Sequence, residues 1–496
     1  MRPLSMTLTA FLLVVGQIQG GGQGKIVQDL WDVAYLQGGR AGYVHTMVRE
    51  SEKNGVKVFS AVQALNLTVK RNKDIINLRM DTGNTETANG KVLGVFMRQY
   101  LGQNKQLEIT GLVSGKQLRL TLDKVKELEP APWDDSVLGL VGQQRLLAEH
   151  KAKPGDKIFF KSFEPTINLV IKNEVEVKDF EDVELLGKTR KRLLRVEIKP
   201  QKLENVQLPT LVWWVDKEFV PLRQQIEAPG LGKINLFRTT KAIALGPAPI
   251  ATLTDIGINQ YVRLKKRIPR PYETREAVYR ITVKNDDDPG STFSRDERQQ
   301  VKNVKGNSFE LHVHAGAVSA KDGEKEPGPE FIQSSYFINS ADARVKQLAR
   351  QAVGGEKDPW KKAQRIEKWV YRNMTAVNDE AMATADHVAK TLKGDCTEYS
   401  MLTAAMCRAE GIPSRTAVGL IYADVAQGPV FAFHMWTEIW INGRWLPIDA
   451  TRATGYVGAT HLKITDHSWH DTRTLTPLFP LVRVLGRVNI EVLRSE

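Results

Sequence analysis

The dipeptide Asn442-Gly443 constrains the fold of this chain more tightly than any other feature. It stands between two runs in which apolar and polar residues alternate, and Asn-Gly in that setting is a strong signal for a two-residue β-hairpin. The register of such a turn sets Asp449 opposite Trp436 and diagonal to His434. Diagonal neighbours in an antiparallel pair lie within side-chain reach, so the sequence predicts a hydrogen bond between Asp449 and His434.

A helix is expected to begin at Cys396, because Asp395 is a favourable N-cap residue. Gly411 provides a C-terminal stop. The apolar stripe that this helix would bury consists of Leu402, Ala405, Met406 and Ala409. Unpaired N–H groups and the dipole at the start of a helix stabilise a thiolate, whereas the carboxylate of Asp395 opposes it. Cys396 is therefore a candidate nucleophile that needs a cationic partner.

The second cysteine, Cys407, has a different expected role. It lies 11 positions beyond Cys396, about 16 Å along one helix, which is beyond disulfide reach. Its place deep in the helix indicates a buried structural thiol. The two cysteines are thus expected to act separately.

His434 and Asp449 supply the groups that a thiol nucleophile requires. His434 would take the proton of Cys396 and later donate it to a leaving amine, while Asp449 would hold the imidazole in one tautomer. Trp436 lies beside His434 and is a candidate for shielding the site or for supporting the substrate or the oxyanion. Together these residues predict thiol-dependent acyl transfer on an amide bond.

The same stretch resembles the transglutaminase-like family, which belongs to the papain-like cysteine protease superfamily. The segments that carry the resemblance are residues 394–398, 408–415, 434–438 and 445–451. The resemblance implies a helix that carries the cysteine and packs on an antiparallel sheet that carries the histidine and the aspartate. It also implies acyl transfer through a thioester to water or an amine, with Cys396 as nucleophile, His434 as base and Asp449 as the orienting acid.

The rest of the chain divides by its patterning. Residues 25–245 show alternation with turn signals, as in residues 107–122 around Ser114-Gly115, and this is typical of an antiparallel curved sheet or sandwich. Residues 246–335 are expected to form a linker and a small β region, and residues 336–496 the catalytic domain. The expected fold class is α+β, with a β-rich N-terminal region followed by a papain-like core.

The N-terminus has the order of a secretory signal peptide, assigned to residues 1–24. Arg2 precedes the apolar run 8–15, and a Gly-rich segment follows. That run is too short for a lasting membrane anchor, which needs about 20 apolar residues. We expect an exported, bacterial-type protein of the periplasm or the extracellular space.

The charge balance bears on the partners. A formal net charge of +13 and a pI near 9.4 draw the chain toward anionic surfaces. No dense Lys/Arg block with interleaved aromatic residues occurs, so a nucleic-acid partner is not expected. A peptide or protein substrate is expected, and the charge favours one associated with the cell wall or envelope.

No cofactor and no metal are expected. His312 and His314 share one face of a strand without a third ligand nearby, so they are interpreted as exposed polar residues. The acidic run Asp286–Asp288 is expected to be a solvated turn and not a calcium loop. Three further histidines lie on a stretch expected to be irregular, and they are His461, His467 and His470.

Three functional readings stay open. Hydrolysis is favoured over transamidation, because transamidation requires a water-shielded amine channel that a sequence does not reveal. A non-catalytic binding or scaffold protein would not need all three of Cys396, His434 and Asp449. The β-rich region could bind a partner, lipid or wall polymer, or cover the site. The substrate and the oligomeric state do not follow from the sequence.

Overall fold

The computed structural model describes residues 24–53, 55–71, 74–101, 105–122, 126–128, 130–203, 208–228, 232–247, 249, 253–255, 261–315, 325–377, 382–470 and 476–496. The expected signal peptide, residues 1–24, lies outside these described residues except for Gly24. Within the described ranges, no helix combines the length and the apolar character needed to cross a membrane.

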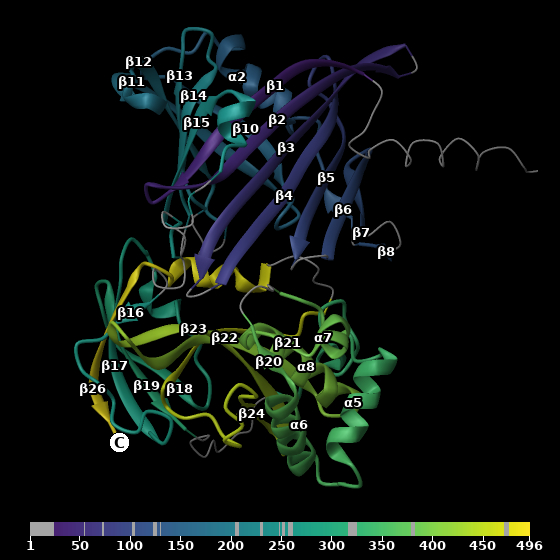
Figure 1. Ribbon diagram of the computed structural model, residues 1–496, viewed down its shortest axis with the longest axis vertical. Coiled ribbons are helices and arrows are strands. Elements are labelled where there is room, and N and C mark those ends of the chain that lie inside the picture. Colours follow the sequence, from purple (N-terminus) through teal and green to yellow (C-terminus); the bar gives the residue numbers. More distant parts are fainter. Residues whose placement is uncertain are drawn as a thin grey trace, which may run out of the picture.

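One large antiparallel sheet forms the N-terminal half (Figure 1, purple to teal). Its 15 strands follow the order β10-β11-β12-β13-β14-β15-β1-β2-β3-β4-β5-β6-β7-β8, with β9 on β7. The sheet consists of two runs of consecutive strands, β10 to β15 and β1 to β8, which join where β15 pairs with β1. Within each run, strands that follow one another in the chain are neighbours in the sheet, as hairpin connections require. The strands are β1 (Lys25–Leu36), β2 (Gly39–Lys53), β3 (Val56–Arg71), β4 (Asp74–Thr87), β5 (Val92–Leu101), β6 (Lys105–Ser114), β7 (Gln117–Leu122), β8 (Lys126–Glu127), β9 (Ala131–Pro132), β10 (Lys157–Glu164), β11 (Leu169–Glu184), β12 (Arg190–Pro200), β13 (Leu211–Val215), β14 (Pro221–Ala228) and β15 (Gly232–Thr239).

Helix α2 (Leu140–Glu149) shows that this sheet is curved. Its Leu147 packs with Val196 of β12, whereas its Gly142 N–H bonds to Glu86 of β4 at 2.9 Å. Six strands separate β12 from β4 in the sheet order, so a flat sheet would hold them roughly 34 Å apart. A helix of this length spans only about 15 Å. The sheet therefore wraps around α2, in agreement with the curved antiparallel sheet expected from the alternation.

The hairpin expected at residues 107–122 is present as β6 and β7, which pair through Ser114 and Gln117 at the turn. Leu118, Leu120 and Leu122 are buried on one face of β7, as their alternation predicts. Sequence patterning thus identifies both the strands and their buried face in this part of the sheet.

Two smaller sheets and four main helices form the C-terminal half (Figure 1, teal to yellow). The first sheet has the order β16-β23-β22-β25, with β24 on β23, and the second has the order β18-β19-β17-β26. Strand β17 pairs with the C-terminal strand β26, so residues of the 246–335 segment share a sheet with the end of the chain. The strands are β16 (Val262–Arg263), β17 (Glu276–Val283), β18 (Gln299–Lys305), β19 (Ser308–His314), β22 (Ser414–Val425), β23 (Gly428–Ile441), β24 (Arg444–Ile448), β25 (His461–His467) and β26 (Val488–Ser495), with a short parallel pair of β20 (Thr375–Ala376) and β21 (Lys393–Gly394).

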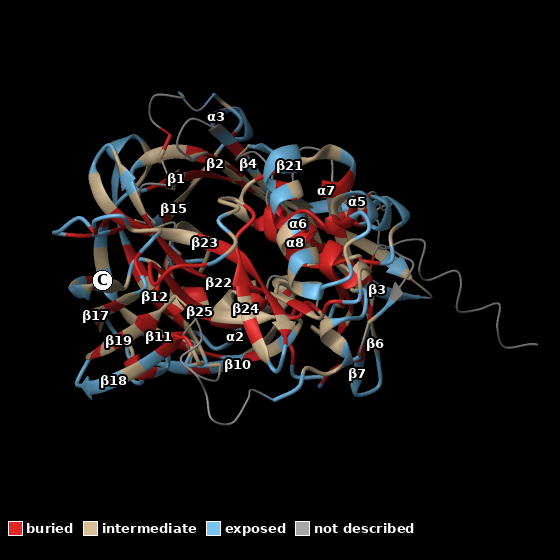
Figure 2. Ribbon diagram, turned by 90° about the horizontal axis from the view of Figure 1, so that it is seen from below, coloured by how far each residue is buried: buried red, intermediate tan, exposed pale blue. Residues whose placement is uncertain are grey.

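Four main helices belong to the described part of the C-terminal half, and the one that begins at Cys396 starts where the sequence predicts. The side chains of Asp342 and Asp358 cap two of them, and Asp395 caps the helix that begins at Cys396. These helices are α5 (Ala343–Val353), α6 (Pro359–Asn373), α7 (Ala385–Thr391) and α8 (Cys396–Ala409). The shorter ones are α3 (Lys241–Ala244) and the 3₁₀ turns η1 (Leu186–Lys188), η3 (Pro289–Ser291), η4 (Pro329–Phe331) and η5 (Thr476–Arg483). Figure 2 shows buried residues concentrated in α8, β22 and β23, at the centre of this half.

The two halves touch through named side chains. Tyr336 packs against the hydrophobic core of the C-terminal half and also against that of β5–β7. Lys202 pairs with Asp287 at 2.7 Å, and Thr254 donates its hydroxyl to the Leu36 carbonyl at 2.7 Å.

The acidic run at Asp286–Asp288 departs from the prediction of a solvated turn. The Asp286 side chain is only 6% exposed and accepts two hydrogen bonds from Arg483. The prediction was wrong for this residue because its partner lies about 200 positions away in the sequence, where no local pattern reveals it. The two strand histidines are partly exposed, and His312 and His314 pair with different carboxylates, Glu310 and Glu276.

Candidate active site

The hairpin around Asn442-Gly443 has the register that the turn predicts. Asn442 and Gly443 have φ values of 50° and 79°, the left-handed conformations of a type I′ turn. Strands β23 and β24 pair from Ile441↔Arg444 to Thr437↔Ile448. Asp449 follows as the next residue, so its carboxylate emerges beside the stretch of β23 that carries His434.

His434 and Asp449 are joined by a hydrogen bond. His434 Nε2 lies 2.8 Å from Asp449 Oδ2, and the two side chains are 8% and 2% exposed. The other carboxylate oxygen, Oδ1, accepts the Thr451 N–H at 2.9 Å and the Thr451 hydroxyl at 2.7 Å. Burial alone would raise the pKa of Asp449, but the charge and hydrogen bond of His434 hold that pKa well below its ordinary value.

Cys396 is the first residue of α8, and its place is set by the turn before it. Gly394 has a φ of +148°, and a Cβ there would lie 2.2 Å from the Glu398 Cβ, so only glycine fits. Asp395 Oδ1 accepts the Thr397 N–H at 2.8 Å, and Glu398 Oε2 accepts the Asp395 N–H at 3.0 Å. This reciprocal capping box fixes the first turn of α8, which begins at Cys396.

Glu398 changes the electrostatics around the cysteine. It is fully buried, and burial, followed by the charge of Asp395, raises the pKa of Glu398. A protonated Glu398 removes one of the two negative charges that would oppose a thiolate at Cys396. The sequence identifies the N-cap at Asp395 but not this buried partner.

Helix α8 packs on one face of β23. Thr437 donates its hydroxyl to the Ser400 carbonyl at 3.2 Å, and Met435 lies in the core that the helices share with the sheet. His434 and Trp436 alternate with these residues and lie on the other face. Cys396 is only partly buried, whereas residues 397–408 of α8 are fully buried, so the cysteine lies at the edge of this packed interface.

Trp436 is placed beside His434 but is itself covered. It is 1% exposed and packs with Ala417 and Val457. Its ring stacks 6.2 Å from the ring of His434. Among the described residues, its Nε1 has no hydrogen-bond partner.

His461 joins the site, although the sequence did not predict this. The stretch expected to be irregular is strand β25, which pairs with β22 and begins at His461. Its Nε2 lies 3.1 Å from Asp449 Oδ2, and its side chain is 3% exposed. Burial lowers the pKa of His461 to about 4, against the raising effect of the hydrogen bond to Asp449. The alternation of Leu462 and Ile464 was the available signal for this strand.

Glu367 of α6 is a second residue that sequence reasoning missed. It is fully buried, and its Oε1 accepts the Asp449 N–H at 3.1 Å. Burial, opposed by that hydrogen bond and reinforced by the charge of Asp449, raises the pKa of Glu367 to about 7. Glu367 stands between Ile366 and Lys368 in the sequence, and this local context carries no signal that the carboxyl group is buried.

A buried ion network holds β25 on the sheet. Lys463, 4% exposed, lies 2.6 Å from Asp296 and 3.2 Å from both Glu438 and Asp466. Glu438 also pairs with Arg415 of β22 at 2.7 Å. The network joins β22, β23 and β25, and its central residue, Lys463, lies two residues after His461 in the sequence.

Three residues of the site could also ligate a metal. His434, Asp449 and His461 each offer one ligand atom, and these atoms lie within 4.8 Å of one another. Two histidines and one carboxylate are a donor set that zinc accepts. In the described structure the same atoms are joined by hydrogen bonds of 2.8 and 3.1 Å.

Cys407 differs from Cys396 in its surroundings. Both cysteines are present as thiols. Cys407 is fully buried in α8, and burial raises its pKa far above the ordinary range. The prediction of a structural thiol at this position agrees with its burial.

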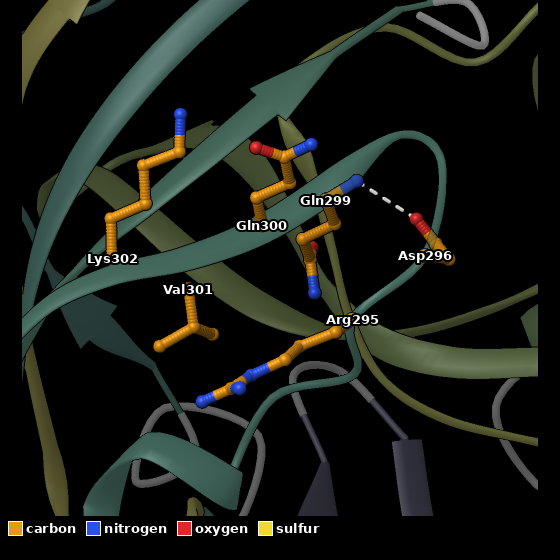
Figure 3. Close-up of a pocket in the computed structure, with 6 residues that line it drawn as sticks. All are labelled: Arg295, Asp296, Gln299, Gln300, Val301 and Lys302. Atoms are coloured by element: carbon orange, nitrogen blue, oxygen red, sulfur yellow. Dashed lines mark hydrogen bonds between the residues drawn. The ribbon is translucent and has the colours of Figure 1, made fainter. Parts of the chain in front are cut away.

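A cavity of about 410 Å³ lies at β18, away from these residues. Figure 3 shows its lining, in which the Gln299 N–H bonds to Asp296 at 2.8 Å. Neither His434 nor Asp449 lines it. Its wall is nevertheless connected to the ion network, because Asp296 pairs with Lys463. The lining residues are Arg295, Asp296, Gln299, Gln300, Val301 and Lys302.

The domain has a papain-like fold, in which a helix that begins with cysteine packs on an antiparallel sheet that bears the histidine, and the aspartate directly follows one of the strands. Residues 346–450 match the Transglutaminase-like superfamily. The C-terminal half of the chain thus contains a transglutaminase-like domain, which confirms the resemblance noted in the sequence motifs.

One curated relative, an uncharacterized protein of Haemophilus influenzae, is 32% identical over 96 residues. The match covers 18% of this chain and 26% of the relative, so it spans about a quarter of the relative's length. It therefore concerns a segment of each chain and not the whole protein.

Two solved structures show remote likeness. A candidate cysteine protease of Cytophaga hutchinsonii is 16% identical, with 45% of this chain and 87% of that chain covered and a TM-score of 0.28. A β-barrel-like protein of Brucella abortus is 10% identical, with 43% and 95% covered and a TM-score of 0.33. Likeness at these TM-scores carries no argument about activity.

Proposed function

We propose that the transglutaminase-like domain performs thiol-dependent acyl transfer on an amide bond, with Cys396 as nucleophile, His434 as general base and Asp449 as the orienting acid. The observation that carries this proposal is the buried hydrogen bond of 2.8 Å between His434 Nε2 and Asp449 Oδ2. The preferred reaction is hydrolysis of a peptide or amide in the cell envelope.

The hydrogen bond to Asp449 decides which nitrogen of His434 takes part in the proposed proton route. Because Nε2 of His434 is engaged by Asp449, Nδ1 is the nitrogen that takes the proton of Cys396. The thiolate attacks the substrate carbonyl carbon, and the backbone N–H of Cys396 is the proposed donor to the oxyanion. His434 then protonates the leaving amine as the C–N bond breaks, and a thioester remains on Cys396.

Water completes the cycle. His434 takes a proton from water as its oxygen attacks the thioester carbon. The C–S bond then breaks, the acid leaves, and the proton returns to the Cys396 sulfur. Trp436 is proposed to shield the imidazole, since its buried ring stacks 6.2 Å away.

The location and the partner are part of the proposal. The sequence order of residues 1–24 supports export, and the net charge of +13 supports attraction to an anionic envelope. The proposed substrate is a peptide or protein of that envelope. Transamidation is the alternative reaction, because a thioester reacts with an amine as well as with water. The other alternative is that the protein is a non-catalytic scaffold and not an enzyme.

One assay separates these readings. The full-length protein is supplied with a glutamine-containing peptide and a labelled primary amine, and both ammonia or peptide release and incorporation of the label are measured. Cys407→Ala serves as the matched control for Cys396→Ala. Hydrolysis predicts release without incorporation, lost only in Cys396→Ala, whereas incorporation supports transamidation.

Two outcomes would contradict the thiol mechanism. The first is equal turnover by Cys396→Ala and the wild type. The second is loss of turnover when a chelator is added, because that result would assign the chemistry to a metal held by His434, Asp449 and His461. Absence of turnover and of any acyl-enzyme with a panel of envelope peptides would support the scaffold reading.

A further inference from the structure

The Asp449 carboxylate accepts a hydrogen bond at every available position. Thr451 supplies two donors to Oδ1, while His434 and His461 each direct Nε2 to Oδ2, at 2.8 and 3.1 Å. An ionised carboxylate offers about four lone-pair sites. His461 therefore supplies the last donor, and it shares one oxygen with the proposed base.

The surroundings of His461 keep it neutral. It lies 3% exposed at the start of β25, and among the described residues its Nδ1 has no hydrogen-bond partner. A buried imidazole with one nitrogen unpaired favours the neutral form that carries its proton on Nε2. The charged or titratable groups that face His461 and its partner are Asp449 after β24, His434 on β23, Arg298 before β18 and Glu367 on α6.

We propose that His461 is a positioning residue for the thiol mechanism, holding the Asp449 carboxylate in the orientation that serves His434. This inference rests on the proposed function of Cys396 and goes beyond it. A neutral donor suits this task because it stabilises the carboxylate without adding a positive charge that would compete with the imidazolium of His434.

The fold supports this assignment over simple packing. The ion network at Lys463 fixes β25 two residues after His461. The Trp436 ring meets the His461 ring edge-on at 5.4 Å, which limits rotation of the imidazole. If packing were the whole role, an apolar side chain of similar volume would serve equally well.

Two substitutions separate the hydrogen bond from the packing. His461→Leu keeps much of the volume and removes the donor, whereas His461→Gln retains an amide N–H near the position of Nε2. His461→Asn carries a shorter amide that does not reach Asp449, and it replaces the leucine variant if that variant fails to fold. His312→Leu, on a strand of the other C-terminal sheet, is the matched control.

The experiment measures the rate of Cys396 alkylation by iodoacetamide in the full-length protein between about pH 5 and pH 9. His461→Leu, or His461→Asn in its place, is expected to move the acid limb of the profile up by about one pH unit and to slow alkylation about tenfold near pH 6, because the Asp449 carboxylate loses the donor that holds it toward the His434 imidazolium. His461→Gln should restore the wild-type profile, and His312→Leu should leave it unchanged.

The experiment distinguishes a failure of the proposed role of His461 from a failure of the proposed function. Suppose that the wild-type profile differs from that of an ordinary thiol and that His461→Leu has the same profile as the wild type. The role of His461 is then overturned, while the proposed function stands. A glutamine variant as slow as the leucine variant also overturns the role. If the wild-type Cys396 itself titrates as an ordinary thiol, both proposals fail together.

Discussion

Asp449 lies one residue beyond the last pair of the β23–β24 hairpin, and its Oδ2 is 2.8 Å from Nε2 of His434. A two-residue turn at Asn442-Gly443 is sufficient to bring these side chains together. The proposed chemistry of the domain thus depends on a short-range feature of the sequence.

Replacing Asp449 with asparagine should reduce turnover about 10²- to 10⁴-fold, because an amide neither stabilises the imidazolium nor enforces the correct tautomer. Substrate turnover and acyl-enzyme formation are the measurements. Asp135→Asn, at a side chain 67% exposed in a turn of the N-terminal half, is the control. Equal rates in the two variants would remove Asp449 from the mechanism.

Replacing Gly443 with alanine should destabilise the domain by about 1 kcal/mol, because a residue with a Cβ is strained at a φ of 79°. Gly355→Ala is the matched control, since a Cβ at that position meets nothing within 4 Å and its φ is not positive. Thermal unfolding of both variants gives the comparison. Equal midpoints would show that the turn does not require glycine at position 443.

Glu367 should make the domain less stable as the pH rises. Its pKa is raised from 4.5 to about 7 in the folded state, so the folded protein binds this proton more tightly than the unfolded chain. The stabilisation is complete below about pH 4.5 and is lost as the pH rises through about 7, on the order of 3 kcal/mol in total. Glu367→Gln should flatten this dependence in unfolding measured across that range. A pH dependence identical to that of the wild type would contradict the raised pKa.

The parts of the fold that were predicted depend on local chemistry. The N-cap at Asp395 and the turn at Asn442-Gly443 act within a few residues, so the adjoining sequence is enough to predict them. The burial of Cys407 follows in the same way from its position in a helix.

The missed parts depend on contacts between distant segments. His461 and Glu367 reach Asp449 only because β25 pairs with β22 and because α6 packs against the domain core. Asp286 was interpreted as solvated because Arg483, its partner, belongs to a segment near the C-terminus. Tertiary packing brings these groups together, and single-sequence periodicity carries no signal for it.

The central claim is that His434 activates the thiol of Cys396. The most direct test is the pH dependence of Cys396 alkylation by iodoacetamide, compared between Cys407→Ala and the double variant Cys407→Ala with His434→Gln. Rapid alkylation near pH 6 is expected when His434 is present, and replacing His434 should shift the profile by about two pH units, toward the range of an ordinary thiol near 8.5. Superimposable profiles in the ordinary thiol range would contradict it.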